Sequence, residues 1–460
     1  MLRSPGRSWT STTTAHYNAR RGPDRSEAAT FGGIVTVLSK APGIPASFEP
    51  VNWNPPGLPS DPDEIVRHLV DPLTRGELYP LYHQLRRVAP LHKNRPDMFH
   101  GAITFARFAH ADTLFRNPRI VNDPRVVEEA FNHSNGPFAE VMRNVMIWQE
   151  PEPHRRVRNL IKQAFTPRAI SRWRPIAEQV TGALCDSFEG EGHAELVDRY
   201  NYEIPFAVIT RILGVPEDDV DRIKQLAWDF ARAGEKTVTP DVAKRGDAAA
   251  DAFVEYFGEL AERRRREPAD DLLTSLLAAE ELGARLSHTE LVANCILLLQ
   301  AGHETTQDLI GNALVALFRH PDQLALLRDR PELMKNAVEE FLRYDGSVQI
   351  NHRVALDATE VDGTHIQQGE MLYVFLGAAN RDPARFADPD RLDITRDLSH
   401  HLAFAFGAYY CIGAALARVE IEVALHALLT RFPGLRPLGE TFEWRNTLQL
   451  RGPQRLDVTW

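Results

Sequence analysis

The chain has 460 residues, of which 43% are hydrophobic and 25% are charged. This composition is ordinary for a globular protein and excludes a disordered chain, a fibrous repeat and a disulfide-rich secreted scaffold. The net charge of −10 at pH 7 argues against a nucleic-acid partner, because sequence-independent binding needs a basic surface. No stretch approaches the roughly 18 consecutive apolar residues of a membrane span, so we expect a soluble chain.

Residues 1–50 are rich in Arg, Ser, Thr, Gly and Pro and poor in acids. Such leaders occur as organelle transit peptides, but this one lacks a clear amphipathic helix. An overextended reading frame is a further alternative. We expect a disordered extension over residues 1–50 and one folded domain over residues 51–460.

Helical periodicity dominates from Asp61 onward. The segments that show it are 76–88, 154–164, 171–188, 205–213, 218–232, 247–265, 269–280, 288–319, 321–328, 331–344 and 412–431. Short strand-like segments lie at 100–105, 353–356, 359–367 and 371–375. The pattern predicts one mainly α-helical domain with a small β-rich region.

A run of four arginines, Arg263 to Arg266, follows a predicted helix and precedes Pro268. Cations stabilise the negative end of a helix dipole, and acidic residues flank this run. We therefore expect a solvated helix terminus and not a nucleic-acid patch.

The three cysteines, Cys185, Cys295 and Cys411, lie far apart and show no metal-binding or redox spacing. Cys185 and Cys295 occur in apolar helical patterns, so we expect them to be packed core residues. Low cysteine usage is typical of a reducing compartment, which favours the cytoplasm.

Cys411 differs because it ends a glycine-punctuated segment, residues 404–413, directly before a long apolar helix. A thiolate at a helix N-terminus faces free backbone N–H groups, which predicts a lowered pKa. Gly407 and Gly413 would let the backbone wrap closely around the sulfur. The site suits a nucleophile or a metal ligand, whereas an inert core cysteine would need no flanking glycines.

A second motif, residues 301–306, lies midway along the predicted helix 288–319. Gly302 costs about 0.5–1 kcal/mol inside a helix, which suggests close approach by another group. Thr305 can bond back to a carbonyl and open the helix, and with Glu304 it could relay protons into a cavity. His303 and Glu304 also begin a zinc-protease motif, but Gln307 replaces its second histidine and excludes that interpretation.

Two further motifs are weak in isolation. Glu340 and Arg343 have the spacing of a commonplace helix pair. His154 and Arg158 lie four residues apart on a helix that begins at prolines, so they could grip one anionic group. An exposed, solvated helix face is the alternative for this second pair.

In this order and at these separations, the four motifs resemble those of the soluble bacterial cytochrome P450 family, over residues 52–460. The resemblance implies the cytochrome P450 fold, haem b as cofactor and Cys411 as the axial ligand of the haem iron. It implies haem contacts from His154, Arg158, Ala301, Gly302, Arg353, Phe404, Gly407, Tyr409 and Gly413. It implies dioxygen activation by Glu304 and Thr305. It also implies a structural triad of Glu340, Arg343 and Arg391.

Two positions depart from the family pattern. Tyr409 occupies a position where the family usually has His or Arg, and tyrosine offers one hydrogen bond but no positive charge at neutral pH. Ala405 occupies a position where the family commonly has glycine. Both departures concern how the haem is held and leave iron ligation intact.

The resemblance also implies the activity of a haem-thiolate monooxygenase, which inserts one oxygen atom of dioxygen into a small organic substrate of secondary metabolism. Hydroxylation, epoxidation, aromatic coupling and nitration all use similar scaffolds. Electrons are expected from NAD(P)H through a separate ferredoxin and ferredoxin reductase, to a monomeric enzyme.

Substrate contacts are expected from residues 130–147, 205–212, 348–351 and 447–448 and from the helix around Leu298 and Ala301. Two interpretations from other classes remain. One is a haem-thiolate sensor without turnover, and the other is a helical interaction protein with a buried Cys411.

Overall fold

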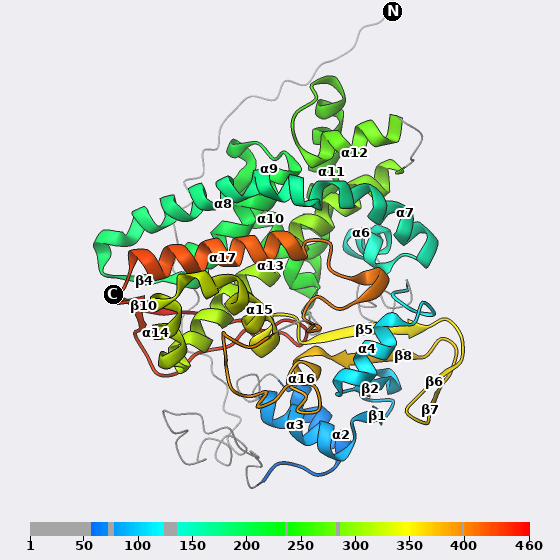
Figure 1. Cartoon of the computed structure of the whole chain (residues 1–460). Helices are drawn as coiled ribbons and strands as arrows, with labels where there is room; N and C mark the ends of the chain where they lie inside the picture. The colour runs from blue at the N-terminus through cyan, green and yellow to red at the C-terminus, as the bar shows by residue number, and fades with distance from the viewer. Residues whose placement is uncertain (1–56, 72–77, 124–135, 235–237, 282–285, 398–399) are drawn as a thin grey trace, which may run out of the picture. The chain divides into compact units, whose positions relative to one another are not determined.

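Helices make up most of the computed structural model, which describes residues 57–71, 78–123, 136–234, 238–281, 286–397 and 400–460 (Figure 1). The expected extension over residues 1–50 lies outside this description, as do residues 130–135 of one expected substrate-contact segment. The fold is mainly α-helical with small β-sheets, as the sequence predicts.

The helices follow the predicted periodic segments closely. They are α2 (Pro62–Val70), α3 (Leu78–Val88), α4 (Phe108–Arg116), α6 (Pro137–Asn144), α7 (Pro151–Ile161), α8 (Pro167–Phe188), α9 (Glu203–Leu213), α10 (Val220–Ala233), α11 (Pro240–Arg266), α12 (Leu272–Glu281), α13 (His288–Arg319), α14 (Pro321–Asp329), α15 (Met334–Asp345), α16 (Leu376–Ala379) and α17 (Ala414–Arg431). The prediction missed four of these helices, α2, α4, α6 and α16, which have 9, 9, 8 and 4 residues and so few turns to show a period.

The larger β region is a five-stranded sheet in the order β1-β2-β8-β5-β3. Its strands are β1 (Leu91–Lys93), β2 (Ile103–Phe105), β3 (Ile120–Val121), β5 (Ile350–Ala355) and β8 (Met371–Phe375). Strand β8 pairs antiparallel with β5 and parallel with β2. This sheet brings β2 and β3 beside β8 and β5, whose residues lie more than two hundred positions later in the sequence.

The remaining strands are short. The expected strand 359–367 is a hairpin of β6 (Thr359–Val361) and β7 (Thr364–Ile366), which turns at Asp362 and Gly363 with φ angles of 48° and 75°. A three-stranded sheet joins β4 (His193–Glu195), β10 (Asp457–Thr459) and β9 (Arg436–Pro437). The sequence pattern predicts none of these three strands, which have only two or three residues and so cannot show alternation.

Helix α13 passes through the core and carries the 301–306 motif. It begins with a capping box, in which the Ser287 hydroxyl accepts from Glu290 N and the Glu290 carboxylate accepts from Ser287 N. Helices α8 and α17 lie side by side (Figure 1), joined by the Arg174–Glu422 ion pair of 2.9 Å and the Arg431–Asp186 ion pair of 2.6 Å. These three helices fix where Cys411 and the 301–306 motif stand.

Three smaller expectations can be compared with the structure. Cys185 and Cys295 are buried, and burial raises their pKa values to about 11 and about 12, so both stay protonated. The arginine run ends α11, where Arg264 donates to the carbonyl of Gly214 over 2.7 Å, which confirms a helix terminus. None of the described helices combines the length and hydropathy needed to cross a bilayer.

Candidate functional site

The segment 404–413 is a tight loop that presents Cys411 just before the N-terminus of α17. Cys411 N donates to the carbonyl of Phe404 over 3.0 Å, which closes the loop. Gly407 has a φ of +74°, and a Cβ there would lie 2.3 Å from the carbonyl oxygen of Phe115. Glycine is therefore required at 407 by both the backbone conformation and the lack of space.

The other two loop positions singled out by the sequence behave differently. Ala405 has a φ of 55°, in the left-handed region that glycine adopts without strain. A Cβ at Gly413 would meet no atom within 4 Å, so the space beside Cys411 is open on this side. The predicted close wrapping thus applies to Gly407, whereas Gly413 borders open space.

The Cys411 side chain is exposed, unlike those of the other two cysteines. The surrounding protein nevertheless excludes part of the water that would stabilise a thiolate, and this desolvation raises the pKa of Cys411. The N–H groups of Gly413 and Ala414 and the guanidinium of Arg158 act in the opposite direction without outweighing it. The prediction of a lowered pKa is therefore wrong, although the predicted donors are present.

Basic side chains from two other elements converge on Tyr409. His154 of α7 stacks on the Tyr409 ring with centroids 4.2 Å apart, and the Arg353 guanidinium of β5 lies 5.2 Å from the same ring. Burial, together with the nearby Arg158 and Arg353, lowers the pKa of His154 to about 4. Burial lowers the pKa of Arg353 to about 10, so it remains charged at pH 7. The structure thus brings together four of the residues expected to contact the haem, including the pair His154 and Arg158 that was expected to grip one anionic group.

The cluster formed by His154, Arg158, Arg353 and Tyr409 contains hydrogen-bond donors that the described residues do not fully satisfy. Arg353 Nη1 donates to Asn122 Oδ1 over 2.8 Å and to the carbonyl of His352 over 2.7 Å, and neither Arg353 nor Arg158 forms an ion pair within the described residues. The buried Tyr409 hydroxyl has no hydrogen-bond partner in the described part of the chain. Buried polar groups are normally paired, so this donor set fits an anion that the polypeptide does not supply.

The cluster and Cys411 together fit a haem. A thiol that faces open space can ligate the iron, whose positive charge would deprotonate it. The cationic and hydroxyl donors beside it match the carboxylates that a haem carries at one edge. The residues present therefore suit the group that the resemblance implies.

The 301–306 motif lies in a continuous stretch of α13. The Thr305 hydroxyl donates to the carbonyl of Ala301 over 3.2 Å, so the expected bond back to the helix is present without a break in the helix. Ala301 is exposed, although most of α13 around it is buried. A Cβ at Gly302 would lie 2.8 Å from Ile209 Cγ1 of α9, so helix packing explains the close approach at this glycine.

Glu304 forms part of a charged group whose other members, Asp308 and Arg445, no sequence motif indicated. Arg445 Nη2 donates to Glu304 Oε1 over 3.0 Å, and Arg445 Nη1 lies 3.1 Å from each carboxylate oxygen of Asp308. Burial raises the pKa of Asp308 to about 6, although Arg445 opposes this shift. The sequence does contain a signal for this group. Glu304 and Asp308 lie four residues apart on one helix and would repel each other, which indicates that a cation lies between them.

Two expected substrate-contact segments are neighbours in the structure. Val348 and Leu450 form a bridge, and Gln349 N donates to the carbonyl of Gln449 over 2.8 Å. The Thr447 hydroxyl donates to the carbonyl of Leu450 over 2.7 Å, which shapes the turn between them. Residues 348–351 therefore lie against the turn that contains residues 447–448.

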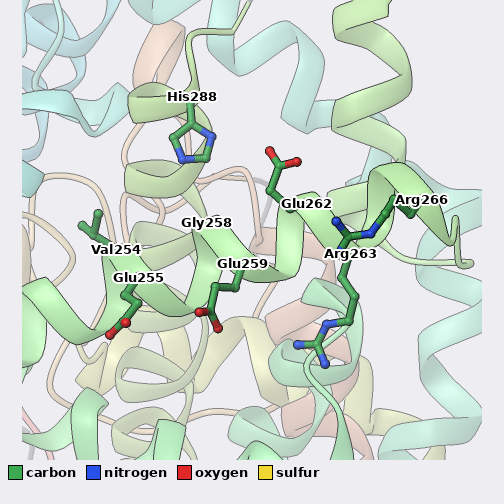
Figure 2. A pocket seen from close by; sticks show the side chains of 8 residues that line it. All are labelled: Val254, Glu255, Gly258, Glu259, Glu262, Arg263, Arg266 and His288. Carbon is green, nitrogen blue, oxygen red and sulfur yellow. The ribbon is translucent and has the colours of Figure 1, made fainter. Parts of the chain in front are cut away.

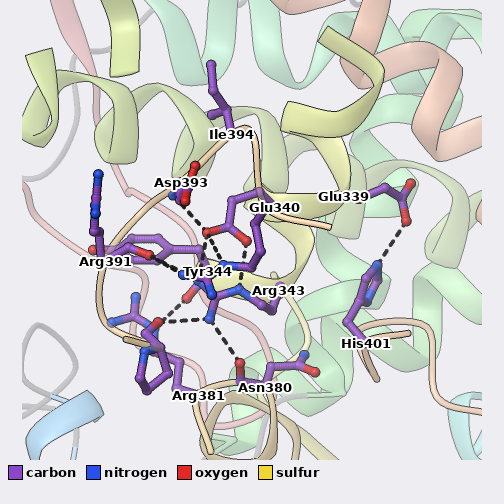
Figure 3. Close-up of polar contacts among 12 residues, drawn as sticks. Glu339, Glu340, Arg343, Tyr344, Asn380, Arg381, Arg391, Asp393, Ile394 and His401 are labelled. Atoms are coloured by element: carbon purple, nitrogen blue, oxygen red, sulfur yellow. Dashed lines mark hydrogen bonds and ion pairs between the residues drawn. The ribbon is translucent and has the colours of Figure 1, made fainter. Parts of the chain in front are cut away.

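Figure 3 shows the buried network around Glu340 and Arg343. Arg343 Nε and Nη2 donate to the two Glu340 oxygens over 2.7 and 2.8 Å. Arg391 contributes only its backbone carbonyl, 3.4 Å from Arg343 Nη2, because a tight turn from Asp388 leaves its side chain exposed. Arg396 Nε lies 3.4 Å from Glu340 Oε1 and is the second cation on this carboxylate. The predicted triad is therefore wrong in its third side chain.

Two other hollows lie outside this cluster. Residues of α11, together with His288 at the start of α13, line a groove of about 690 Å³ (Figure 2). Its residues are Val254, Glu255, Gly258, Glu259, Glu262, Arg263, Arg266 and His288. A second hollow, of about 480 Å³, lies beside the cysteine loop and includes Phe404, whose ring lies 4.6 Å from the Arg418 guanidinium. Neither combines a nucleophile with an acid–base pair.

Comparison with known proteins gives a consistent result. The family model for Cytochrome P450 matches residues 116–440. The 6-deoxyerythronolide B hydroxylase of Saccharopolyspora erythraea is 38% identical over 396 residues, which cover 83% of this chain and 95% of that protein. Nocardicin C N-oxygenase of Nocardia uniformis is 42% identical over 320 residues, covering 68% and 79%. The crystal structure of P450BioI, in complex with an acyl carrier protein ligated to hexadec-9Z-enoic acid, matches with a TM-score of 0.79 at 33% identity, covering 84% of this chain and 99% of that one.

Proposed function

The chain belongs to the cytochrome P450 family and is a cytochrome P450 monooxygenase, and on that premise we propose that it oxidises a small organic substrate of secondary metabolism. One observation carries the proposal most directly: an exposed Cys411 lies beside a cluster of anion-binding side chains that have no acidic partner in the described residues. Two relatives that are named for oxidising 6-deoxyerythronolide B and nocardicin C support the substrate class.

The family implies haem, and we propose how this chain holds it. Cys411 Sγ would ligate the iron, and His154, Arg158, Arg353 and Tyr409 would bind the propionates. The remaining contacts come from Ala301, Gly302, Phe404, Gly407 and Gly413. When bound, the haem supplies dioxygen activation, and the thiolate favours cleavage of the O–O bond.

Glu304 and Thr305 form the proposed proton route. The Thr305 hydroxyl is partly exposed and can rotate to accept one proton while it donates another. The Glu304 side chain is 21% exposed and its Oε2 has no partner in the described residues, so it can exchange protons with solvent. A positioned acid of this kind contributes typically 10²–10⁴-fold to rate.

We also propose that the enzyme is a cytoplasmic monomer that receives electrons from NAD(P)H through a separate ferredoxin and ferredoxin reductase. The small number of cysteines supports a reducing compartment. Hydroxylation and epoxidation are the proposed reactions, with aromatic coupling and nitration as alternatives on the same scaffold.

The test begins with the spectrum of the reduced protein under carbon monoxide. Thiolate ligation gives a red-shifted Soret band, which Cys411→Ala should abolish and Cys185→Ala and Cys295→Ala should leave intact. A histidine-type spectrum in the wild type would refute the ligand assignment. A substrate panel then separates enzyme from sensor: a compound that changes the haem spin state and yields product supports the enzyme, whereas a spin change without product supports the sensor.

A further inference from the structure

Arg445 lies in a turn near the C-terminal strand β10, outside the sequence motifs. We define the C-terminal turn as residues 444–453, which is closed by a bridge between Trp444 and Pro453 and by a hydrogen bond of 2.9 Å from Arg445 N to the carbonyl of Gly452. The side chain of Arg445 extends from this turn to α13. There it meets two acids that stand one helical turn apart.

Asp308 holds the inner end of this contact. Its side chain is fully buried, and both of its oxygens lie 3.1 Å from Arg445 Nη1. A Cβ at Gly452 would lie 2.2 Å from Asp308 Oδ1, so the turn lies directly against the carboxylate. This packing leaves Asp308 little freedom, and it fixes the guanidinium with it.

Glu304 meets the outer end of the guanidinium. Arg445 Nη2 donates to Glu304 Oε1 over 3.0 Å, and Oε2 has no partner in the described residues. The two Glu304 oxygens therefore differ: one is held by a fixed cation, and the other is open to proton exchange.

We propose that Arg445, fixed by Asp308, is a positioning residue that orients Glu304 for proton delivery to Thr305. The inference rests on the proposed proton route and deepens it. The step involves only protons: Glu304 Oε2 takes up a proton from solvent and passes it, through solvent, to the Thr305 hydroxyl. Thr305 releases its own hydroxyl proton towards the substrate side of α13, while Glu304 Oε1 remains bonded to Arg445.

The test uses the holoenzyme with its redox partners and a confirmed substrate. Arg445→Gln alone would strand a buried carboxylate and could prevent folding. The main variant is therefore the double variant Arg445→Gln with Asp308→Asn, which retains polar groups at both positions without a buried charge. Arg455→Gln is the matched control, because Arg455 pairs with Asp457 in the same C-terminal region and outside the site.

The double variant should keep the wild-type carbon-monoxide spectrum and bind substrate within about twofold of wild type. It should lose about tenfold in turnover. This loss is smaller than the 10²–10⁴-fold that a positioned acid or base contributes, because Glu304 itself remains in the variant. Its solvent deuterium isotope effect on turnover should rise, because proton delivery becomes limiting. Arg455→Gln should match the wild type in all three measurements.

A double-mutant cycle separates positioning from a general structural role. In a Glu304→Gln background, the Arg445–Asp308 double variant should cause no further loss of turnover. An equal tenfold loss in both backgrounds would overturn the inference about Arg445. A Glu304→Gln variant that turns over and couples normally would instead overturn the proton route itself, so the two failures are distinguishable.

Discussion

Replacing Tyr409 with phenylalanine isolates one atom of the proposed haem site. The phenylalanine ring keeps the stack on His154, at 4.2 Å, and the contact with Arg353, at 5.2 Å. Only the hydroxyl is lost, and it has no hydrogen-bond partner in the described residues. Removing an unpaired buried donor is close to neutral or stabilising, so the haem-free protein should not lose stability.

The haem-bound protein should respond in the opposite direction. A hydrogen bond to a charged group contributes about 1.5–3 kcal/mol. If Tyr409 donates to a propionate, Tyr409→Phe should speed haem loss by about 10- to 150-fold. The assay follows haem transfer to an excess of an acceptor protein, with Tyr410→Phe, an exposed neighbour, as the matched control. An unchanged rate of haem loss would show that the hydroxyl makes no contact with the haem.

Three further changes test other parts of the reasoning. Ala405→Gly relieves a left-handed residue, with φ of 55°, and should stabilise the protein by about 0.5–1 kcal/mol in urea unfolding; no gain would mean that the loop carries no strain. Arg396→Ala should lower the free energy of unfolding by about 1.5–3 kcal/mol because it removes a cation from the buried Glu340. Arg391→Ala should change the free energy of unfolding by less than about 0.5 kcal/mol. A larger loss for Arg391→Ala than for Arg396→Ala would restore the original triad. Thr305→Ala should release more hydrogen peroxide and less product per NAD(P)H consumed, while Thr305→Ser should retain coupling; full coupling in both would exclude this hydroxyl from the proton route.

The sequence predicted elements whose signals are local. Helix α13 matches its predicted range because its apolar residues recur at three- and four-residue spacings along the whole segment 288–319. The cysteine loop was also recognisable, since Gly407 and the helix after Cys411 lie within a few positions of each other.

Properties that depend on distant packing could not be predicted in this way. The choice of Arg396 over Arg391 follows from how one turn orients two side chains against Glu340. The raised pKa of Cys411 is a balance between lost hydration and several donors, and the sequence reveals the donors but not how closely the protein surrounds the thiol. Arg445 lies 141 positions from Glu304, so no spacing rule connects them.

The Arg445–Asp308 contact has a consequence for biosynthesis of the chain. The two residues are 137 positions apart, and Asp308 is made first. At about 5–20 residues per second on the ribosome, its counter-ion arrives on the order of 10–30 seconds later. During that interval the middle of α13 contains a carboxylate that cannot be buried as it is in the finished protein. Native closure of this helix therefore waits for synthesis of Arg445, and nascent chains truncated before Arg445 should stay susceptible to proteases around α13.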